Sequence, residues 1–181
     1  MSPSRVLSPY TDILLSSLQF QGYTNNCGPT TTAIVLNAFC GLNLNGPDLA
    51  EKMNKMVWRG VLPVVRRIPN SATLPWGMVD VFRSHNMKAS WRFFTRTSHL
   101  FEGLARGRIL MPVIGSVKPV SAHVMTLVAW DQENGWGFAN TAYEEHEIFW
   151  ENDPRFKETW GTFNKSWRVT AHLLVEARHD G

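Results

Sequence analysis

The chain of 181 residues contains only two cysteines, Cys27 and Cys40, and no run of about 18 apolar residues that could cross a membrane. We expect both cysteines on one helix, about 20 Å apart, which is too far for a disulfide. Two free thiols suit a reducing compartment. The first residues show no apolar stretch followed by a small-residue cleavage site, so no signal peptide is visible. These absences predict a cytoplasmic protein with no membrane partner.

Charge is also sparse. Charged residues make up 18 % of the chain, and 18 basic against 15 acidic residues give a net charge of +3 that is scattered along the sequence. Nucleic-acid-binding chains usually carry a clustered basic stripe, so we expect no nucleic-acid partner. Glu145, His146 and Glu147 alternate in a way that does not put three ligands on one helical face, and no cysteine–histidine pair has metal-ligand spacing. We therefore predict neither a metal nor a cofactor, and a solvated loop at 145–147.

The order of apolar patterns predicts a single α+β domain over residues 1–181, with helices first and an antiparallel sheet second. An irregular lead-in is expected over 1–20 and a long surface loop over 58–73, which is rich in Gly, Pro and Asn. A side-chain cap at Thr73 is expected for the third helix. The expected helices are 29–40, 47–56, 75–85, 98–106 and one from about 153, and the expected strands are 88–96, 108–117, 122–130, 136–141 and 167–177.

Cys27 lies at the start of the first predicted helix and is followed by Gly28 and Pro29. Proline is favoured in the first turn, and the unpaired N–H groups and positive dipole there stabilise an anion such as a thiolate. A helix amino terminus and a nearby imidazolium can lower a cysteine pKa from about 8.5 to roughly 3.5–7.5. Gly28 is expected to let a substrate backbone approach. A cysteine can equally be a small buried hydrophobe, a description that fits Cys40, so Cys27 needs partners before it is read as a nucleophile.

His123 and Asn140 are the candidate partners of Cys27. His123 begins a strongly apolar strand, where a histidine is either a satisfied core residue or a functional one. If the following hairpin closes with Trp130 opposite Gly135, His123 and Asn140 lie on one face, one diagonal step apart. An amide there accepts a hydrogen bond from one imidazole nitrogen and leaves the other facing the thiol.

Gln21 stands six residues before Cys27 and is the candidate for the last part of the site. Its side-chain amide and the Cys27 backbone N–H could together hold an oxyanion. Gln19 competes for this role if the loop is tighter. Asp131 is interpreted as part of a turn, and Trp136 is the first guess for an aromatic residue lining the cleft.

The order Gln21, Cys27-Gly-Pro, His123 and Asn140 resembles the papain-like cysteine peptidases. Within that clan, N-N-C-G-P-T-T-T-A-I-V-L, then P-V-I from Pro112, then H-V-M-T-L-V-A-W-D, is similar to the bacteriocin-leader-processing (double-glycine) peptidases and their stand-alone relatives. The likeness covers roughly residues 21–142. It implies a helical layer that carries Cys27, packed on a sheet that carries His123, and cleavage of a peptide or amide bond through a thioester.

The sequence departs from that family in two respects. The family usually has Asp, often followed by Pro, where this chain has Asn140 and Thr141, although Asn is the papain-type choice. Leader-processing members are fused to a transporter, and no membrane segment is visible here, so their substrate does not carry over. Two alternatives stay open: an acyltransferase or cyclase that uses the same Cys-His-Asn site on a carrier-bound acyl substrate, and a non-catalytic binding module. The oligomeric state is not predicted.

Overall fold

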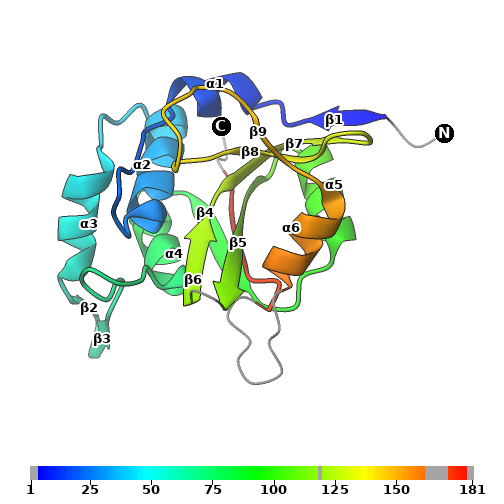
Figure 1. The fold of residues 1–181 in the computed structure, drawn as a ribbon. Helices are drawn as coiled ribbons and strands as arrows, with labels where there is room; N and C mark the ends of the chain where they lie inside the picture. The colour runs from blue at the N-terminus through cyan, green and yellow to red at the C-terminus, as the bar shows by residue number, and fades with distance from the viewer. Residues whose placement is uncertain (1–3, 118–119, 162–170, 179–181) are drawn as a thin grey trace.

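The computed structural model describes residues 4–117, 120–161 and 171–178 (Figure 1). The helices are α1 (Thr11–Ser16), α2 (Cys27–Cys40), α3 (Gly46–Asn54), α4 (Pro75–Ser84), α5 (Thr97–Ala105) and α6 (Asp153–Trp160). The strands are β1 (Arg5–Leu7), β2 (Val57–Arg59), β3 (Leu62–Val64), β4 (Lys88–Arg92), β5 (Ile109–Val117), β6 (Val120–Val124), β7 (Thr126–Asp131), β8 (Gly135–Ala139), β9 (Phe149–Glu151) and β10 (Leu174–Arg178).

One sheet organises the fold. Its strands follow the order β4-β10-β5-β7-β8-β9, with β1 added to β7 and β6 added to β5, and the neighbouring strands pair antiparallel. The helices α2, α3 and α4 lie to one side of it in Figure 1, and α5 and α6 lie to the other. This arrangement confirms the predicted α+β class.

The two faces of the sheet bury two separate apolar clusters, because successive side chains of a strand point to opposite faces. On β10, Val175 and Ala177 belong to the cluster under α2 and α4, whereas Leu174 belongs to the cluster around α5 and α6. On β5, Met111 and Leu110 divide in the same way. The candidate site described below lies on the α2 side.

Helix α2 is buried through most of its length, from Gly28 to Leu36, as expected for a helix with apolar or small residues all round. It ends at Gly41, whose φ of 62° gives the left-handed conformation that glycine adopts without strain. The predicted start at Pro29 was two residues late, because α2 begins at Cys27. Cys27 is therefore the first residue of the helix itself.

Several predicted elements need correction. Residues 58–73 are not a structureless loop: β2 and β3 form a hairpin, and Arg67 and Thr73 form an isolated β-bridge. Thr73 does not cap α4, whose N-cap is Leu74 and has no side-chain cap bond. The lead-in contains α1 and β1, and the strand β9 was not predicted. The strand expected over 88–96 ends at Arg92, and part of the one expected over 167–177 lies outside the described residues.

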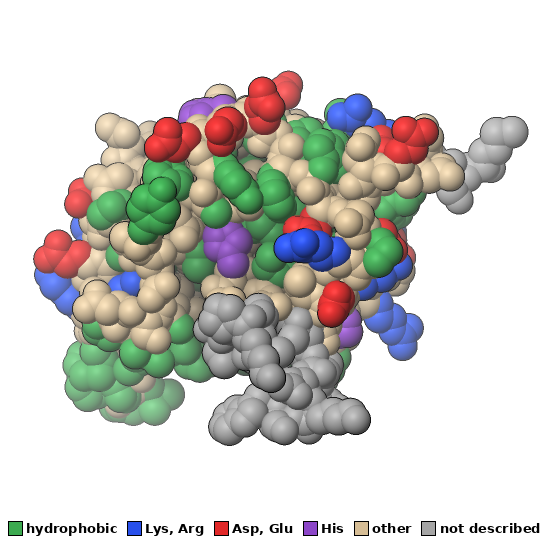
Figure 2. Space-filling model, in the orientation of Figure 1, with side chains coloured by type: hydrophobic (Ala, Val, Ile, Leu, Met, Phe, Trp, Pro, Cys, Tyr) green, Lys and Arg blue, Asp and Glu red, His purple; other side chains and the backbone are tan. Residues whose placement is uncertain are grey.

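The β2–β3 hairpin projects from the body below α3 (Figure 1) and exposes Trp58, Val61 and Leu62. Figure 2 shows this end of the molecule as a mainly hydrophobic surface. Among the residues that the structure describes, no helix is long and apolar enough to cross a membrane.

Glu176 on β10 is the buried centre of a partly exposed ionic cluster on the face of the sheet opposite the site. Its carboxylate is 4 % exposed and accepts from His99 at 2.9 Å and from Arg108 at 3.1 Å, with Arg92 and Arg178 also within ion-pair distance. Burial raises the pKa of Glu176, but hydrogen bonds from His99 and Arg178 and the charge of Arg108 outweigh it, so the pKa is lowered overall. The ionised form is thus favoured by folding.

Replacing Glu176 with Gln is expected to lower the free energy of unfolding at pH 7 by about 2 kcal/mol, because charge-assisted hydrogen bonds are lost. A folded pKa below the unfolded value adds stability above the unfolded pKa of about 4.3, and this stability is lost as pH falls through the folded pKa. Urea unfolding between pH 3 and 7 should therefore show a steeper acid loss in the parent than in Glu176→Gln. Equal pH slopes in the two proteins would contradict this role.

Candidate active site

Cys27 occupies the amino terminus of α2 and is half-buried. The N-cap residue Asn26 makes no side-chain cap bond, so its amide does not cover the first N–H groups of the helix. The Gly28 backbone instead forms a hydrogen bond with the thiol. The sulfur thus lies where the helix dipole and free N–H groups favour a negative charge.

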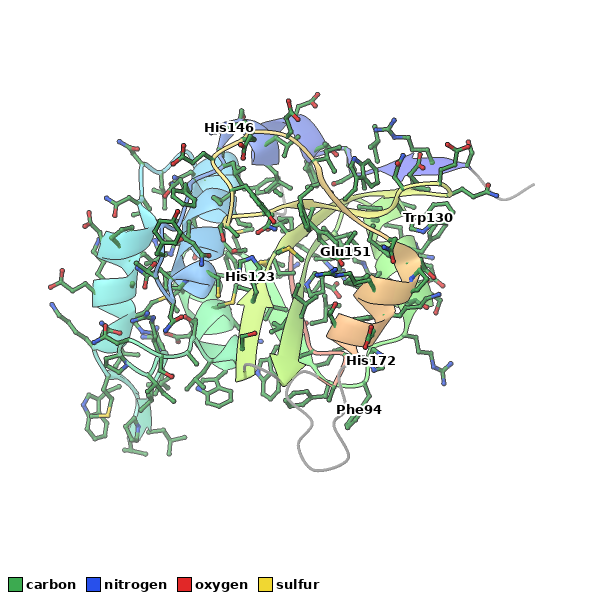
Figure 3. The ribbon with its side chains drawn as sticks, viewed as in Figure 1. Phe94, His123, Trp130, His146, Glu151 and His172 are labelled. Atoms are coloured by element: carbon green, nitrogen blue, oxygen red, sulfur yellow. The ribbon has the colours of Figure 1, made fainter. Side chains whose placement is uncertain are left out.

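His123 lies on β6, which pairs with β5 and places His123 opposite Ile114. Figure 3 shows the His123 side chain between the amino-terminal end of α2 and the sheet. The Cys27 thiol forms a hydrogen bond with the imidazole, and its sulfur lies 4.0 Å from the carbonyl oxygen of Ala122. The helix and the sheet therefore each contribute one member of the pair.

Asn140 follows β8 and is 5 % exposed. Its Oδ1 lies 2.7 Å from His123 Nε2 and also accepts from the backbone N–H of Ala142 at 3.0 Å. Since a backbone N–H can only donate, the amide atom between these two groups is the oxygen. Neutral His123 must then carry its proton on Nε2, which leaves Nδ1 for the thiol.

The pKa values of the pair shift in opposite directions. Burial raises the pKa of Cys27. This effect is outweighed by the hydrogen bond to His123, by the positive charge of the imidazolium and by backbone hydrogen bonds with Val124 and Gly28, so the pKa of Cys27 is lowered overall. Burial lowers the pKa of His123, but the hydrogen bond and charge of Cys27 and the Asn140 contact outweigh it, so the pKa is raised. Both shifts favour a thiolate–imidazolium pair.

The hairpin register that predicted the His123–Asn140 proximity was wrong at its closing end. The structure pairs Trp130 with Trp136, one residue further along than the expected partner Gly135. A β-bulge between Leu127 and Ala129 then shifts the register back. The two shifts cancel, so the expected alignment is restored where the strands approach the site.

The strand expected over 122–130 is in fact two strands separated at Met125. The first of them, β6, leaves the hairpin and pairs with β5, whereas β7 pairs with β8. His123 and Asn140 therefore meet across a strand break, and not as diagonal neighbours on one hairpin. The proximity was predicted, but the reason for it was not.

Gln21 lies at the cavity next to Cys27, whereas Gln19 does not. The Gln21 Oε1 accepts from Thr141 Oγ1 at 2.7 Å, and its Nε2 donates to Thr24 O at 3.0 Å. These contacts fix the amide and leave one of its two N–H groups free of those bonds. Gln19 donates to Leu44 O and accepts from Gly46 N between α2 and α3, so of the two candidates only Gln21 is placed near the thiol.

Gly28 lines the cavity next to Cys27, and the space that a side chain at this position would need is already occupied. A Cβ built on Gly28 would lie 2.4 Å from the Cβ of Thr73, so Thr73 of the same chain fills the space beside this glycine. The close approach that requires glycine is therefore internal to the protein.

A cavity of about 490 Å³ opens beside Cys27 and His123. Figure 2 shows a histidine at the surface in the middle of this face, at the position that Figure 3 labels His123. Met78, Val113 and Leu173 supply apolar walls, and among the described residues no Asp, Glu, Lys or Arg side chain lines it. The cavity therefore suits an uncharged, largely apolar group bound next to the sulfur.

Two further predictions have clear outcomes. Trp136 does not line this cavity: it is 3 % exposed in the cluster on the opposite face of the sheet, where its Nε1 donates to Asp153. Asp131 belongs to the turn, as predicted, and accepts from the backbone N–H groups of Glu133 and Asn134. The 145–147 segment is exposed, also as predicted.

Arg67 was not assigned to the site from the sequence, although the pair Arg66-Arg67 was visible within 58–73. Its side chain is 3 % exposed and donates to the Asn26 side chain at 2.8 Å and to the Asn25 carbonyl oxygen at 3.2 Å, next to Cys27. An arginine in a segment read as a surface loop is expected to be solvated, and only the tertiary structure places it beside the thiol.

No family model and no curated protein matches the sequence of the chain. Its fold is similar to the crystal structure of a proposed C39-like peptidase from Bacillus anthracis, with a TM-score of 0.68 and 10 % sequence identity. The match covers 99 % of this chain and 100 % of that chain. The structural similarity shows the papain-like α+β fold that the sequence predicted.

Proposed function

We propose that this protein is a papain-like cysteine hydrolase that cleaves a peptide or amide bond through a thioester. The observation that carries the proposal is the connected series Cys27–His123–Asn140, with the thiol at a helix amino terminus and Oδ1 of Asn140 2.7 Å from His123 Nε2. Such a nucleophile, base and orienting group define nucleophilic catalysis by geometry. The papain-like fold of the neighbouring C39-like structure supports the same reading.

In this mechanism the Cys27 thiolate attacks the carbonyl carbon, and the carbonyl electrons move onto the oxygen. The resulting oxyanion is held by the Cys27 N–H and by the remaining N–H of Gln21. The C–N bond breaks as the His123 imidazolium gives its proton to the leaving amine. Water then attacks the thioester while His123 takes its proton, and cleavage of the C–S bond releases the acid and the thiolate. Asn140 keeps the imidazole in the required orientation throughout.

The substrate group next to the sulfur should be uncharged, because the described lining of the cavity offers no charged partner for a buried carboxylate or ammonium. The same apolar lining supports a second candidate function, acyl transfer, in which an amine or carbon nucleophile replaces water at the thioester. Similarity to the bacteriocin-leader-processing group remains part of the proposal at the level of fold and chemistry, without its substrate. A connected series in which Cys27 and His123 line one cavity and Asn140 holds His123 from behind is not expected of a pure binding module.

The first test is the rate of iodoacetamide alkylation of each cysteine against pH, mapped by mass spectrometry. Cys27 is expected to react well below pH 8, since its pKa is lowered, whereas burial raises the pKa of Cys40, which serves as an internal reference. The advantage of Cys27 should disappear in His123→Ala. A Cys27 that reacts like an ordinary thiol with or without His123 would remove the basis for the enzyme.

Peptide and acyl-thioester libraries then separate hydrolysis from transfer. Hydrolysis predicts release of the free acid whether or not an added amine is present. Transfer predicts that the amine product replaces the acid, and that the acylated Cys27 accumulates when no amine is supplied. Cys27→Ala is the control for both reactions.

A further inference from the structure

Arg67 lies beneath the turn that leads into α2, on the segment between β3 and α4. Its Nη1 donates to Asn54 Oδ1 at 2.7 Å, and its Nη2 donates to Asn26 Oδ1 at 2.8 Å and to the Asn25 carbonyl oxygen at 3.2 Å. The side chain is almost fully buried, and its Nε has no hydrogen-bond partner among the described residues. Arginine is rarely fully buried, so a buried guanidinium bound by three amide oxygens is unusual in a segment at the surface.

The contact with Asn26 changes how α2 begins. An asparagine at the N-cap ordinarily accepts from the N–H groups of the first turn, but the Asn26 side chain makes no such bond because its oxygen is turned to Arg67. Pro29 has no N–H, so the only group this cap could have covered is the Gly28 N–H, and it is left uncovered. This N–H is left to contact the Cys27 thiol.

The contact with Asn25 satisfies a backbone carbonyl oxygen that lies just outside α2. Asn25 precedes the N-cap Asn26, and the hydrogen-bond ladder of α2 begins only with the Asn26 carbonyl oxygen, which accepts from Thr30 N–H. The Asn25 carbonyl oxygen is outside this ladder, and Arg67 supplies a donor to it. Arg67 therefore satisfies the backbone and the side chain that immediately precede Cys27.

The charge of Arg67 acts in the same direction. Arg67 donates to Asn25 and Asn26, the two residues immediately before Cys27, so its positive charge lies close to the thiol. Burial lowers the pKa of Arg67, and the charge of Cys27 opposes this effect. The interaction is reciprocal, so the guanidinium also favours the thiolate. Within the described part of the chain no carboxylate forms an ion pair with Arg67, and its hydrogen-bond partners are neutral amides. His123 is the other charged group that faces the thiol.

We propose that Arg67 is a positioning residue of the active site. It holds the Asn26 side chain away from the amino terminus of α2, so that the Gly28 N–H remains available to the thiol, it fixes the turn that positions Cys27, and its charge stabilises the Cys27 thiolate. The inference rests on the proposed function for its catalytic meaning, but its main readout, the reactivity of Cys27, needs no substrate.

The test compares Arg67→Met with Arg66→Met. Each variant loses one neighbouring arginine of the same segment: Arg67 is buried and Arg66 is partly buried. Arg66 donates to the Lys52 carbonyl oxygen and lies 3.9 Å from Asp80, away from the Asn26 contact. In Arg67→Met the alkylation profile of Cys27 should move to higher pH, with a rate at pH 6 about tenfold below the parent, which corresponds to one pKa unit. Arg66→Met should keep the parental profile.

Arg67→Lys keeps the positive charge but loses the hydrogen bonds that the two guanidinium Nη atoms make. This variant serves as the test if Arg67→Met does not fold. We expect a smaller shift of the alkylation profile in Arg67→Lys, with kcat lowered more than KM is raised, since an oxyanion donor is misplaced. A parental alkylation profile in folded Arg67→Met, or in Arg67→Lys together with parental kcat, overturns the inference. An equal shift in Arg66→Met also overturns it.

These outcomes are distinct from failure of the proposed function. If the parent shows no turnover of any amide or thioester substrate but its Cys27 profile still moves with Arg67, the positioning role stands and the reaction is wrong. If the parent hydrolyses an amide or thioester substrate and the alkylation profile of Cys27 does not depend on Arg67, the proposed reaction stands and the proposed role of Arg67 is wrong.

Discussion

Replacement of His123 by alanine is expected to reduce kcat/KM for any amide substrate by at least about 10³-fold, the largest effect apart from the Cys27→Ala control, which lacks the nucleophile. The variant loses both the base that generates the thiolate and the acid that protonates the leaving amine. The loss should be greatest near neutral pH. There the lowered pKa of Cys27 and the raised pKa of His123 keep both members of the pair charged in the parent.

The pH profile of the parent follows from the same two shifts. Activity should rise as Cys27 loses its proton, below the ordinary pKa of a thiol, and fall as His123 loses its proton, above the ordinary pKa of an imidazole. The pH range of activity is therefore wider on both sides than it would be with ordinary pKa values for the thiol and the imidazole. His123→Ala should lose this bell shape along with the rate.

Asn140 provides the matched control for His123. Asn140→Asp keeps an oxygen for His123 Nε2 and for the Ala142 N–H, so it should retain much of the activity. Asn140→Ala removes that oxygen and should lose activity while Cys27 remains alkylatable. If Asn140→Ala and Asn140→Asp have equal kcat, the amide does not orient the imidazole.

Gly28→Ala is expected to have the second-largest effect, on both stability and turnover. The added methyl carbon would lie 2.4 Å from the Thr73 Cβ, closer than two carbon atoms that are not bonded to each other can approach. Either Thr73 or the first turn of α2 must move, at a cost of about 1–3 kcal/mol for overpacking. Movement of the turn would displace Cys27 from His123, so activity should fall by more than the loss of folded protein explains.

A loss of stability in Gly28→Ala would point to the clash, because alanine in place of glycine otherwise stabilises a helix by about 1 kcal/mol. Gly28→Ala combined with Thr73→Gly should remove the clash and recover turnover, with Thr73→Gly alone as the reference. Urea unfolding and kcat/KM of the three variants provide the measurement. A Gly28→Ala protein as stable and active as the parent would show that Thr73 moves aside without effect on the site.

The parts of the site that the sequence predicted are those with local signals. Cys27 before Gly-Pro marks a helix start, and a Gly at position 41 marks its end, so the helix was found to within two residues at one end. The choice between Gln19 and Gln21 was open because it depends on the path of the loop. That path is set by the tertiary contacts of Gln19 with Leu44 and Gly46.

The parts that the sequence did not predict depend on pairing between distant segments. No local pattern reports the bulge between Leu127 and Ala129, or the departure of β6 from its hairpin. Trp136 was placed on the wrong face for the same reason, because strand alternation identifies two faces without naming the neighbour of either. Arg67 was missed because burial of a charged side chain becomes visible only when Asn25, Asn26 and Asn54 surround it.

The division of the site between α2 and β6 also has a kinetic consequence. Cys27 and its contact Ala122 are separated by 95 positions, so the sulfur meets the strand only after a long loop has closed. Contacts of this length form slowly, whereas a helix such as α2 can form in about a microsecond. During refolding, the thiol should therefore behave first as an ordinary cysteine and acquire its enhanced reactivity when helix and sheet dock. Pulsed alkylation at pH 6 would time that docking directly, with Cys40 on the same helix as the reference.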